Sequence, residues 1–242
     1  MDTSSKTRIA KYLARLGVAS RREIEAKIFR GEISVNGIPA TTPAIFVDAQ
    51  DKIHISGHLI NPHMPLTRLF LYHKPTGIIV THKDPESRPT VFESVDLPIP
   101  RILSVGRLDL NSQGLLLLTN DGALARTLEH PKTALKRTYR VRVWGRVCHD
   151  ALSRLKEGLT VEGITYGPIE AHLESQKGEN AWVTLSLWEG KNREIRKIMT
   201  HLGLEVNVLI RTSYGPFDLG NLPKGAFQEV TKEAFHPFLE HF

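Results

Sequence analysis

The chain has 242 residues, of which 40% are hydrophobic and 24% are charged, a composition that excludes long disorder and is typical of a globular protein with a full core. Its apolar runs are far too short to cross a bilayer, its first residues lack the apolar segment of a secretion signal, and its net charge of +6 favours a polyanionic partner. A single cysteine, Cys148, excludes a disulfide framework, so we expect a cytoplasmic protein without membrane association.

The first thirty residues predict two short helices. In TRIAKYLARL, residues 7–16, the apolar residues have helical spacing, and Gly17 supplies a C-terminal stop. Ser20 and Glu23 match the capping box that opens a helix, which we extend to about Arg30. The segments 33–37 and 51–57 alternate and predict short strands joined by turns.

This segment also holds most of the excess charge, because eight Lys and Arg face three Asp and Glu within residues 1–30. Each cation taken alone is explained by a solvated helix face. Cations on two consecutive helices would instead neutralise several phosphates at once. The candidate phosphate contacts are Arg8, Lys11, Arg15, Arg21 and Arg22.

Residues 61–68 contain two prolines and show no apolar periodicity, so we interpret them as a linker between domains 1–60 and 69–242. Segment 70–84 predicts two strands interrupted at residues 75–77, and 101–106 predicts another. Residues 115–118 are four leucines, which favours a strand buried on both faces. A helix over 123–130 should end before Pro131.

The second half of the chain predicts more strands than helices. Residues 136–147 alternate, with Tyr139, Val141 and Val143 on one face. Segments 166–174, 181–190 and 205–215 predict further strands, and 149–159 and 192–203 predict helices. This order indicates an α+β protein built around a mixed, largely antiparallel sheet.

Asp109 is an unusual charge, because it stands just before the leucine run. It could simply shape a turn, as aspartate often does in loops. Asn111, Ser112 and Gly114 already supply turn residues, however, so the turn does not require Asp109. A carboxylate that leads into an apolar strand is costly to desolvate unless a cation pairs with it.

Two groups of cations could supply that partner. Arg107 lies two residues earlier, and the segment EGKNREIRK contributes Lys191, Arg193, Arg196 and Lys197. A solvated basic helix end is the simpler explanation of this segment, but the helix dipole disfavours cations at a helix N-terminus. Their position therefore indicates an anionic partner.

Other site chemistries find little support in the sequence. A glycosidase would need a second carboxylate, and no spacing selects Asp121 or Glu194 for that role. The G-x-S-x-G elbow, the phosphate-binding loop and the dinucleotide fingerprint are absent. We predict neither a metal nor a cofactor.

Two resemblances connect these features. Ser20–Gly31 followed by Ile33, Val35, Asn36 and Gly37 resembles the small RNA-binding domain of the ribosomal protein S-four type. Four segments resemble, in the same order, the motifs of the RsuA/RluB branch of the ribosomal RNA pseudouridine synthases: GRLDLNSQGLLLLTNDG (106–122), KRTYRV (136–141), EGKNREIRKI (189–198) and LIRTSYGP (209–216). Together the resemblances cover nearly the whole chain.

The second resemblance implies an isomerase without a cofactor that converts uridine in folded RNA to pseudouridine. It makes Asp109 the essential carboxylate, acting either as a nucleophile on the ribose or as the base that starts an elimination. It aligns Tyr139 with a tyrosine that stacks on the flipped base, although a core aromatic would have the same pattern. It aligns Arg196 with the residue that pairs with the carboxylate, and Leu209, otherwise a core aliphatic, with an apolar wall. Arg107 is either structural or RNA-facing.

The likeness of KDPESRPTVFE, residues 83–93, to the RluB type favours 23S large-subunit RNA over the 16S RNA of the RsuA type. We expect a monomer whose partner is ribosomal RNA. The remaining candidate RNA contacts are Arg88, Lys191, Arg193 and Arg211. Arg211 either contacts phosphate or supports the residues that line the site. Two alternatives stay open, a non-catalytic RNA-binding ribosome-assembly factor and a hydrolase that transfers the sugar to water.

Overall fold

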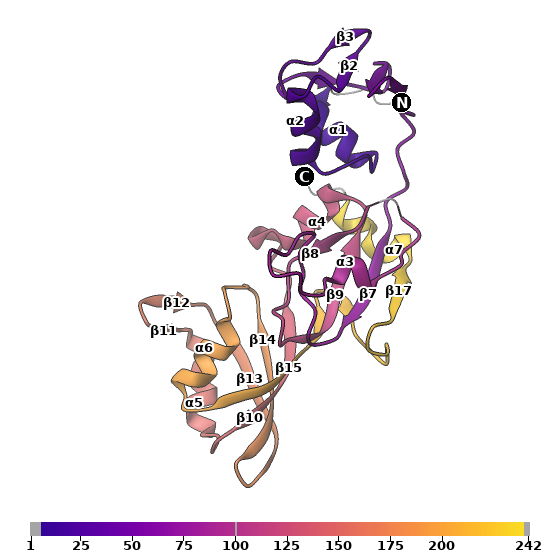
Figure 1. Ribbon diagram of the computed structural model, residues 1–242. Coiled ribbons are helices and arrows are strands. Elements are labelled where there is room, and N and C mark those ends of the chain that lie inside the picture. The colour runs from indigo at the N-terminus through magenta and orange to yellow at the C-terminus, as the bar shows by residue number, and fades with distance from the viewer. Residues whose placement is uncertain (1–5, 100, 240–242) are drawn as a thin grey trace. The chain divides into compact units, whose positions relative to one another are not determined.

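The computed structural model describes residues 6–99 and 101–239, and the chain divides into two compact units. Unit 1 contains the described residues up to 68 together with 98–103 and 120–122, and unit 2 contains the other described residues. Figure 1 shows the ribbon of both units, and each unit has its own hydrophobic core. Within the described ranges, no helix has the length and apolar character needed to cross a membrane.

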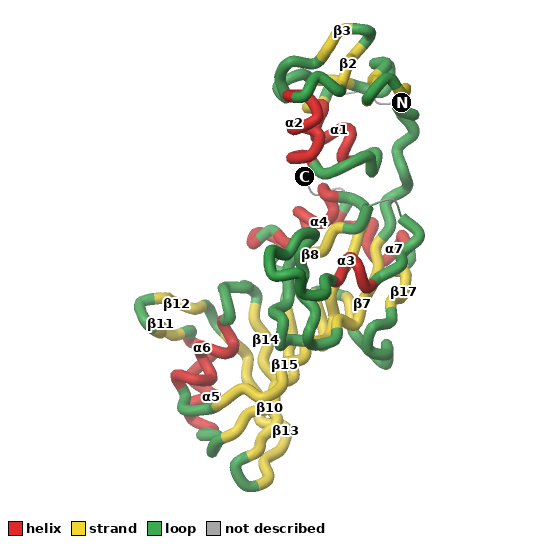
Figure 2. Tube along the Cα trace, in the orientation of Figure 1, coloured by secondary structure: helices red, strands yellow, loops and turns green. Residues whose placement is uncertain are grey.

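Unit 1 contains two helices and short strands (Figure 2). Ile9, Leu13, Ile24 and Ile28 form the centre of its core. The helices are α1 (Ile9–Arg15) and α2 (Arg21–Phe29), and the strands are β1 (Thr7–Arg8), β2 (Ile33–Val35), β3 (Ile38–Pro39), β4 (Phe46–Val47), β5 (Ile53–Ile55) and β6 (His58–Leu59). Strand β1 pairs with β4, and the others form a sheet in the order β3-β2-β5-β6.

The capping box predicted for the second helix is confirmed. The Ser20 hydroxyl accepts a hydrogen bond from the Glu23 amide at 3.2 Å, and the Glu23 carboxylate accepts one from the Ser20 amide at 2.8 Å. Both predicted helices are therefore present, although the first begins at Ile9 because Thr7 and Arg8 pair with β4.

The segment predicted to be a linker contains no helix or strand among residues 61–68. Its end is nevertheless fixed by side chains of unit 1. Asn120 accepts a hydrogen bond from the Arg68 amide at 2.8 Å and donates one to the Leu66 carbonyl at 2.7 Å. The Thr67 hydroxyl donates to Asp121 at 2.8 Å. The domain boundary at 61–68 stays a prediction.

Unit 2 is built on one large mixed sheet, which has nine strands within the described part of the chain. The order along the sheet is β13-β14-β10-β15-β9-β7-β17, with β16 added to β15 and β8 to β9. The strands are β7 (Leu69–Lys74), β8 (Leu103–Val105), β9 (Gln113–Thr119), β10 (Arg137–Trp144), β13 (Ile169–Lys177), β14 (Asn180–Leu187), β15 (Glu205–Tyr214), β16 (Phe217–Asp218) and β17 (Phe227–Val230). The α+β architecture with a largely antiparallel sheet is confirmed.

Helices and a separate hairpin complete this unit. Figure 1 shows α5 and α6 beside β10, β13, β14 and β15, and contacts join α5 to β13 and α6 to β15. The remaining elements are α3 (Val91–Ser94), α4 (Gly122–Glu129), α5 (His149–Arg154), α6 (Glu194–His201), α7 (Lys232–Phe235), the 3-10 helices at Pro131–Thr133, Leu155–Glu157 and His236–Phe238, and the hairpin of β11 (Leu159–Val161) and β12 (Ile164–Tyr166).

The two halves of the sheet meet where β9 runs parallel to β15, whereas the other neighbours along the path are antiparallel. The parallel register joins Gln113 to Ile210 and Gly114 to Arg211. On the other edge of β9, the four leucines pair with β7 and are fully buried, as predicted. The loop that carries Asp109 enters the sheet directly at this junction.

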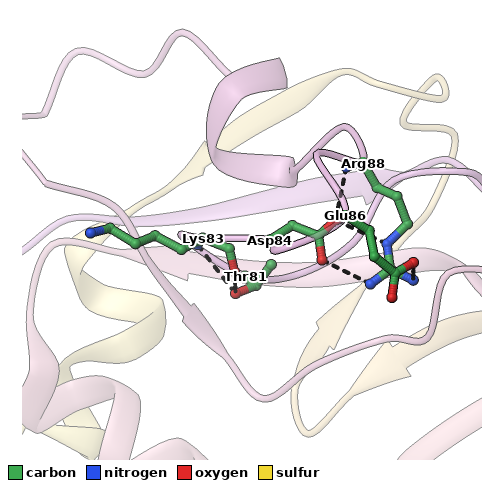
Figure 3. Close-up of polar contacts among 5 residues, drawn as sticks. All are labelled: Thr81, Lys83, Asp84, Glu86 and Arg88. Carbon is green, nitrogen blue, oxygen red and sulfur yellow. Dashed lines mark hydrogen bonds and ion pairs between the residues drawn. The ribbon is translucent and has the colours of Figure 1, made fainter.

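The prediction of a second strand within 70–84 is wrong. Among the described residues 78–84, Ile79 forms an isolated bridge with Thr90, and a compact loop follows. Figure 3 shows its cause: the Asp84 carboxylate accepts hydrogen bonds from the Arg88 amide at 2.8 Å and from the Arg88 guanidinium at 2.8 and 3.0 Å. The Thr81 hydroxyl donates to the Lys83 carbonyl at 2.8 Å. Side-chain bonds to the local backbone replace strand pairing here.

Gly114 is the position where the sheet junction tolerates least change. Its φ is +107°, and a Cβ atom built there would lie 2.3 Å from the Arg211 carbonyl oxygen. We expect Gly114→Ala to lower the free energy of unfolding by more than about 2 kcal/mol, because the two backbones must separate. Urea denaturation measures this change.

Gly178→Ala is the matched control. Gly178 also has a positive φ, +61°, but no atom lies within 4 Å of the added Cβ. It should cost only about 1 kcal/mol. Equal destabilisation by the two substitutions would contradict the close approach of β9 and β15.

Candidate active site

A cavity of about 860 Å³ opens in unit 2 next to the sheet junction. Residues from the loop before β9, from β10, from the segment between β14 and α6, from α6 itself and from β15 line it. The cavity brings together eight residues selected from the sequence: Arg107, Asp109, Tyr139, Lys191, Arg193, Arg196, Leu209 and Arg211. Segments up to about 100 residues apart in sequence thus share one site.

The backbone around Asp109 is held by a buried lysine. Lys74, at the end of β7, is fully buried, and its Nζ donates hydrogen bonds to the carbonyls of Pro75 at 3.0 Å, Asp109 at 3.1 Å and Ser112 at 2.9 Å. Burial lowers the pKa of Lys74 to about 8, and the Asp109 charge acts in the opposite direction. The ammonium group therefore fixes both ends of the turn that presents Asp109.

The Asp109 side chain itself remains 40% exposed and reaches the cavity. Its ion-pair partner is Arg193, whose Nη1 lies 3.6 Å from Asp109 Oδ2 and whose side chain is 50% exposed. An exposed pair of this length contributes little to stability. Its value lies in placing a cation beside the carboxylate.

The predicted pairing of Asp109 with Arg196 is replaced by this contact. Arg196 Nη1 donates to the Val206 carbonyl at 3.0 Å, and its Nη2 donates to the Asn111 carbonyl at 3.0 Å. Burial and the neighbouring Arg193 lower the pKa of Arg196, while Asp109 raises it. Arg196 thus interacts electrostatically with Asp109 without a direct ion pair. It also binds the carbonyl of Asn111, two residues after Asp109.

Tyr139 and Leu209 form the strand side of the cavity. Tyr139 on β10 is 9% exposed, and Leu209 on β15 is 7% exposed. Tyr139 lies opposite Arg211, and Leu209 lies opposite Val141. Both side chains therefore pack within the sheet and also line the cavity. For these two residues, a core position and a place in the site are compatible.

Of the two roles given to Arg211, its burial fits support of the site and corrects the prediction of an RNA contact. Arg211 is only 2% exposed, and its Nε donates to the Leu115 carbonyl at 2.7 Å. Its guanidinium carbon lies 5.1 Å from the centre of the Tyr214 ring, and that of Arg137 lies 4.7 Å from the same ring. Arg211 ties β15 to β9 instead of offering its charge to phosphate.

Arg88 is paired within its own loop. Besides Asp84, its guanidinium contacts Glu86 at 3.1 Å (Figure 3), and its side chain is 41% exposed, so its contact with RNA stays a prediction. Lys191 pairs with Glu189 and donates to the Thr165 carbonyl at 2.8 Å.

Arg107 is exposed at the cavity. The five candidate cations of unit 1 are all exposed.

Sequence reasoning did not single out three residues that shape this site. They are Lys74, Arg137 and Glu194. In LFLYHK, residues 69–74, alternation places Lys74 on the same buried face as Phe70 and Tyr72. This pattern could have predicted a buried lysine. Arg137 donates to the Tyr214 hydroxyl at 2.8 Å, a contact between the paired strands β10 and β15, whose separation in sequence leaves no local pattern to indicate it.

The comparisons with known proteins agree on one family. Residues 68–201 match the model described as RNA pseudouridylate synthase, and residues 7–53 match the S4 domain. A Rickettsia felis protein named as an uncharacterized RNA pseudouridine synthase is 47% identical over 93% of this chain and 97% of its own length. A Pasteurella multocida protein named ribosomal large subunit pseudouridine synthase B is 44% identical, over 92% of this chain and 66% of its own length.

A solved structure supports the fold. It is described as the crystal structure of pseudouridylate synthase, and it covers 97% of this chain and 100% of its own with a TM-score of 0.66. At 24% identity, this likeness establishes the fold alone.

The contacts of Lys74 predict a large effect on stability. Lys74→Met keeps most of the apolar volume but leaves three carbonyls without their donor. We expect the free energy of unfolding to fall by about 2–4 kcal/mol in urea denaturation. Lys177→Met, at an exposed position of β13, should change it by less than about 0.5 kcal/mol. A small effect at Lys74 would show that its three bonds do not hold the turn.

Proposed function

Because the chain belongs to the RNA pseudouridylate synthase family, it is an RNA pseudouridine synthase, and we propose that Asp109 catalyses the isomerisation of one uridine in 23S large-subunit ribosomal RNA without a cofactor. The observation that carries this proposal is the cavity that Asp109 lines together with its cationic partner, Arg193, and with Tyr139 and Leu209. A carboxylate, an aromatic ring and an apolar wall suit a flipped uridine.

The reaction conserves every heavy atom of the nucleotide. The bond between N1 and C1′ breaks, the uracil turns, C5 bonds to C1′, and the proton of C5 is lost while N1 gains one. Asp109 acts either by attacking C1′ or by removing a proton from the ribose to start an elimination. In both cases the reacting group is the carboxylate, and Arg193 places a cation beside it.

The other residues of the cavity have supporting roles in this proposal. Tyr139 stacks on the flipped uracil and compensates for the stacking that it loses on leaving the RNA. Leu209 closes the apolar side of the cavity, and Arg107 and Arg193 contact the RNA near the target. Arg196 positions the turn of Asp109 through the Asn111 carbonyl.

The choice of ribosomal RNA rests on relatives and on charge. Relatives from Pasteurella multocida and Yersinia pestis, 44% and 39% identical, are named ribosomal large subunit pseudouridine synthase B. The S4 domain over residues 7–53 presents exposed cations for phosphate. We propose that domain 1–60 binds RNA, that domain 69–242 performs the chemistry, and that the protein acts as a monomer in the cytoplasm, where ribosomal RNA is modified.

Asp109→Asn tests the proposed chemistry. The amide cannot act as nucleophile or base, so we expect release of tritium from RNA carrying 5-tritiated uridine to fall by at least about 10³-fold. Asp150→Asn, at an exposed position of α5, should retain the activity of the original protein. Tritium release that survives Asp109→Asn would refute the assignment.

The products of the same assay separate the alternatives. Free uracil would identify a hydrolase that transfers the sugar to water. Tight RNA binding without tritium release by the original protein would identify a non-catalytic RNA-binding factor. Mapping pseudouridine across 23S and 16S RNA, with and without the protein, decides the substrate.

Arg21 and Arg22 test the role of unit 1. Replacing both by glutamine should weaken RNA binding and reduce the slope of log affinity against log salt by about 1–2 units. The rate of a single turnover at saturating protein should not change, because these residues lie outside the cavity. A salt slope equal to that of the original protein would show that they do not contact phosphate.

A further inference from the structure

The segment between β14 and α6 places Arg193 beside Asp109, and its backbone has an uncommon conformation at Arg193. Arg193 has a φ of +51°, a left-handed conformation that is uncommon for a residue with a Cβ. Such a conformation persists only where neighbouring contacts enforce it. The position of the cation beside Asp109 therefore depends on what holds residues 189–194.

Two glutamates hold this segment through Lys191. Glu194 Oε2 accepts a hydrogen bond from the Lys191 amide at 2.9 Å, and the Glu194 amide donates to the Lys191 carbonyl at 3.2 Å. Glu189 pairs with the Lys191 ammonium group and accepts a bond from the Gly167 amide at 2.8 Å. The segment is thus tied at both ends to the carboxyl groups of Glu189 and Glu194.

Glu194 is buried in a way that an ionised carboxylate tolerates poorly. It is 4% exposed, it lines the cavity, and its Oε1 has no hydrogen-bond donor within the described part of the chain. The charged groups that act on it are Glu189 and Lys191. Burial and the Glu189 charge raise the pKa of Glu194 to about 7, while Lys191 opposes them, and Glu189 has a lowered pKa.

We propose that Glu194 is a positioning residue that, in its protonated form, donates a hydrogen bond to the Glu189 carboxylate and thereby keeps Arg193 beside Asp109. One proton lies between the two carboxyl groups, so their repulsion is absent and the unpartnered Oε1 gains a partner. This role rests on the proposed function, because it matters through Arg193 and Asp109. Glu194 itself does not act on the nucleotide.

Loss of that proton disturbs the segment. Glu194 and Glu189 then repel each other, and the ionised Glu194 is stabilised by a displacement of residues 189–194 that separates the two charges and hydrates the buried one. Because the pKa of Glu194 is raised in the folded chain, the stabilising contribution of its proton is complete below pH 4.5 and is lost as the pH rises through about 7. The site therefore holds Arg193 best on the acidic side of neutrality.

The pH profile of single-turnover tritium release tests the proposal. At saturating protein, the rate of the original protein should fall by at least about fivefold between pH 6 and pH 8.5, since one ionisation changes a rate by up to about tenfold per pH unit. Glu194→Gln always carries a donor, so its rate at pH 6 should match that of the original protein and should not fall. Glu194→Ala should be slow at every pH.

Controls make each outcome decisive. Glu205→Gln, at an exposed position of β15, should keep the original pH profile. A flat profile for the original protein, or the same decline in Glu194→Gln, would overturn the proposal. Recovery of the rate by glutamine but not by alanine separates a shared proton from simple packing.

A measurement without RNA distinguishes failure of this inference from failure of the proposed function. The melting temperature of the original protein should fall from pH 5.5 to pH 8.5 more than that of Glu194→Gln. If no tritium is released at any pH but this difference is present, the proposed reaction fails and the shared proton stands. If the melting temperatures of the original protein and of Glu194→Gln change equally with pH and activity is normal, the shared proton is rejected and the proposed reaction stands.

Discussion

The three hydrogen bonds of the Lys74 ammonium group are the interaction on which the site depends. They join the end of β7 to the carbonyls of Asp109 and Ser112, so one buried charge sets the turn that leads into β9. The carbonyl dipoles compensate for part of the desolvation of the ammonium group. A carboxylate can then stand at the edge of a fully buried strand while its own side chain stays 40% exposed.

The junction of β9 with β15 turns this local arrangement into a site. The close approach at Gly114 brings β15 alongside the start of β9, and with it Leu209 and the buried Arg211. The next neighbour, β10, adds Tyr139 opposite Arg211. The catalytic carboxylate that we propose thus comes from one half of the sheet, and the aromatic and apolar walls come from the other.

Local sequence patterns predicted the elements whose stability is local. The capping box of Ser20 and Glu23 and the buried leucines of β9 follow from neighbouring residues alone. The sequence placed Arg193 among the candidate partners of Asp109, but the resemblance selected Arg196 from the same segment. The left-handed Arg193, just before α6, breaks the helical spacing that we assumed for residues 192–203. The burial of Arg211 and the closure of Arg88 onto Asp84 depend on contacts that no periodicity records.

The closed loop at residues 81–88 has a consequence for recognition. The Asp84 side chain is 4% exposed, and its carboxylate binds both the backbone and the guanidinium of Arg88, so these bonds restrict the conformations of the loop in the folded protein. A macromolecule that touches it meets a fixed shape and incurs no further entropy cost for ordering it. Selection by such a loop operates through steric fit, which rejects a wrong surface without needing any attractive contact to the right one.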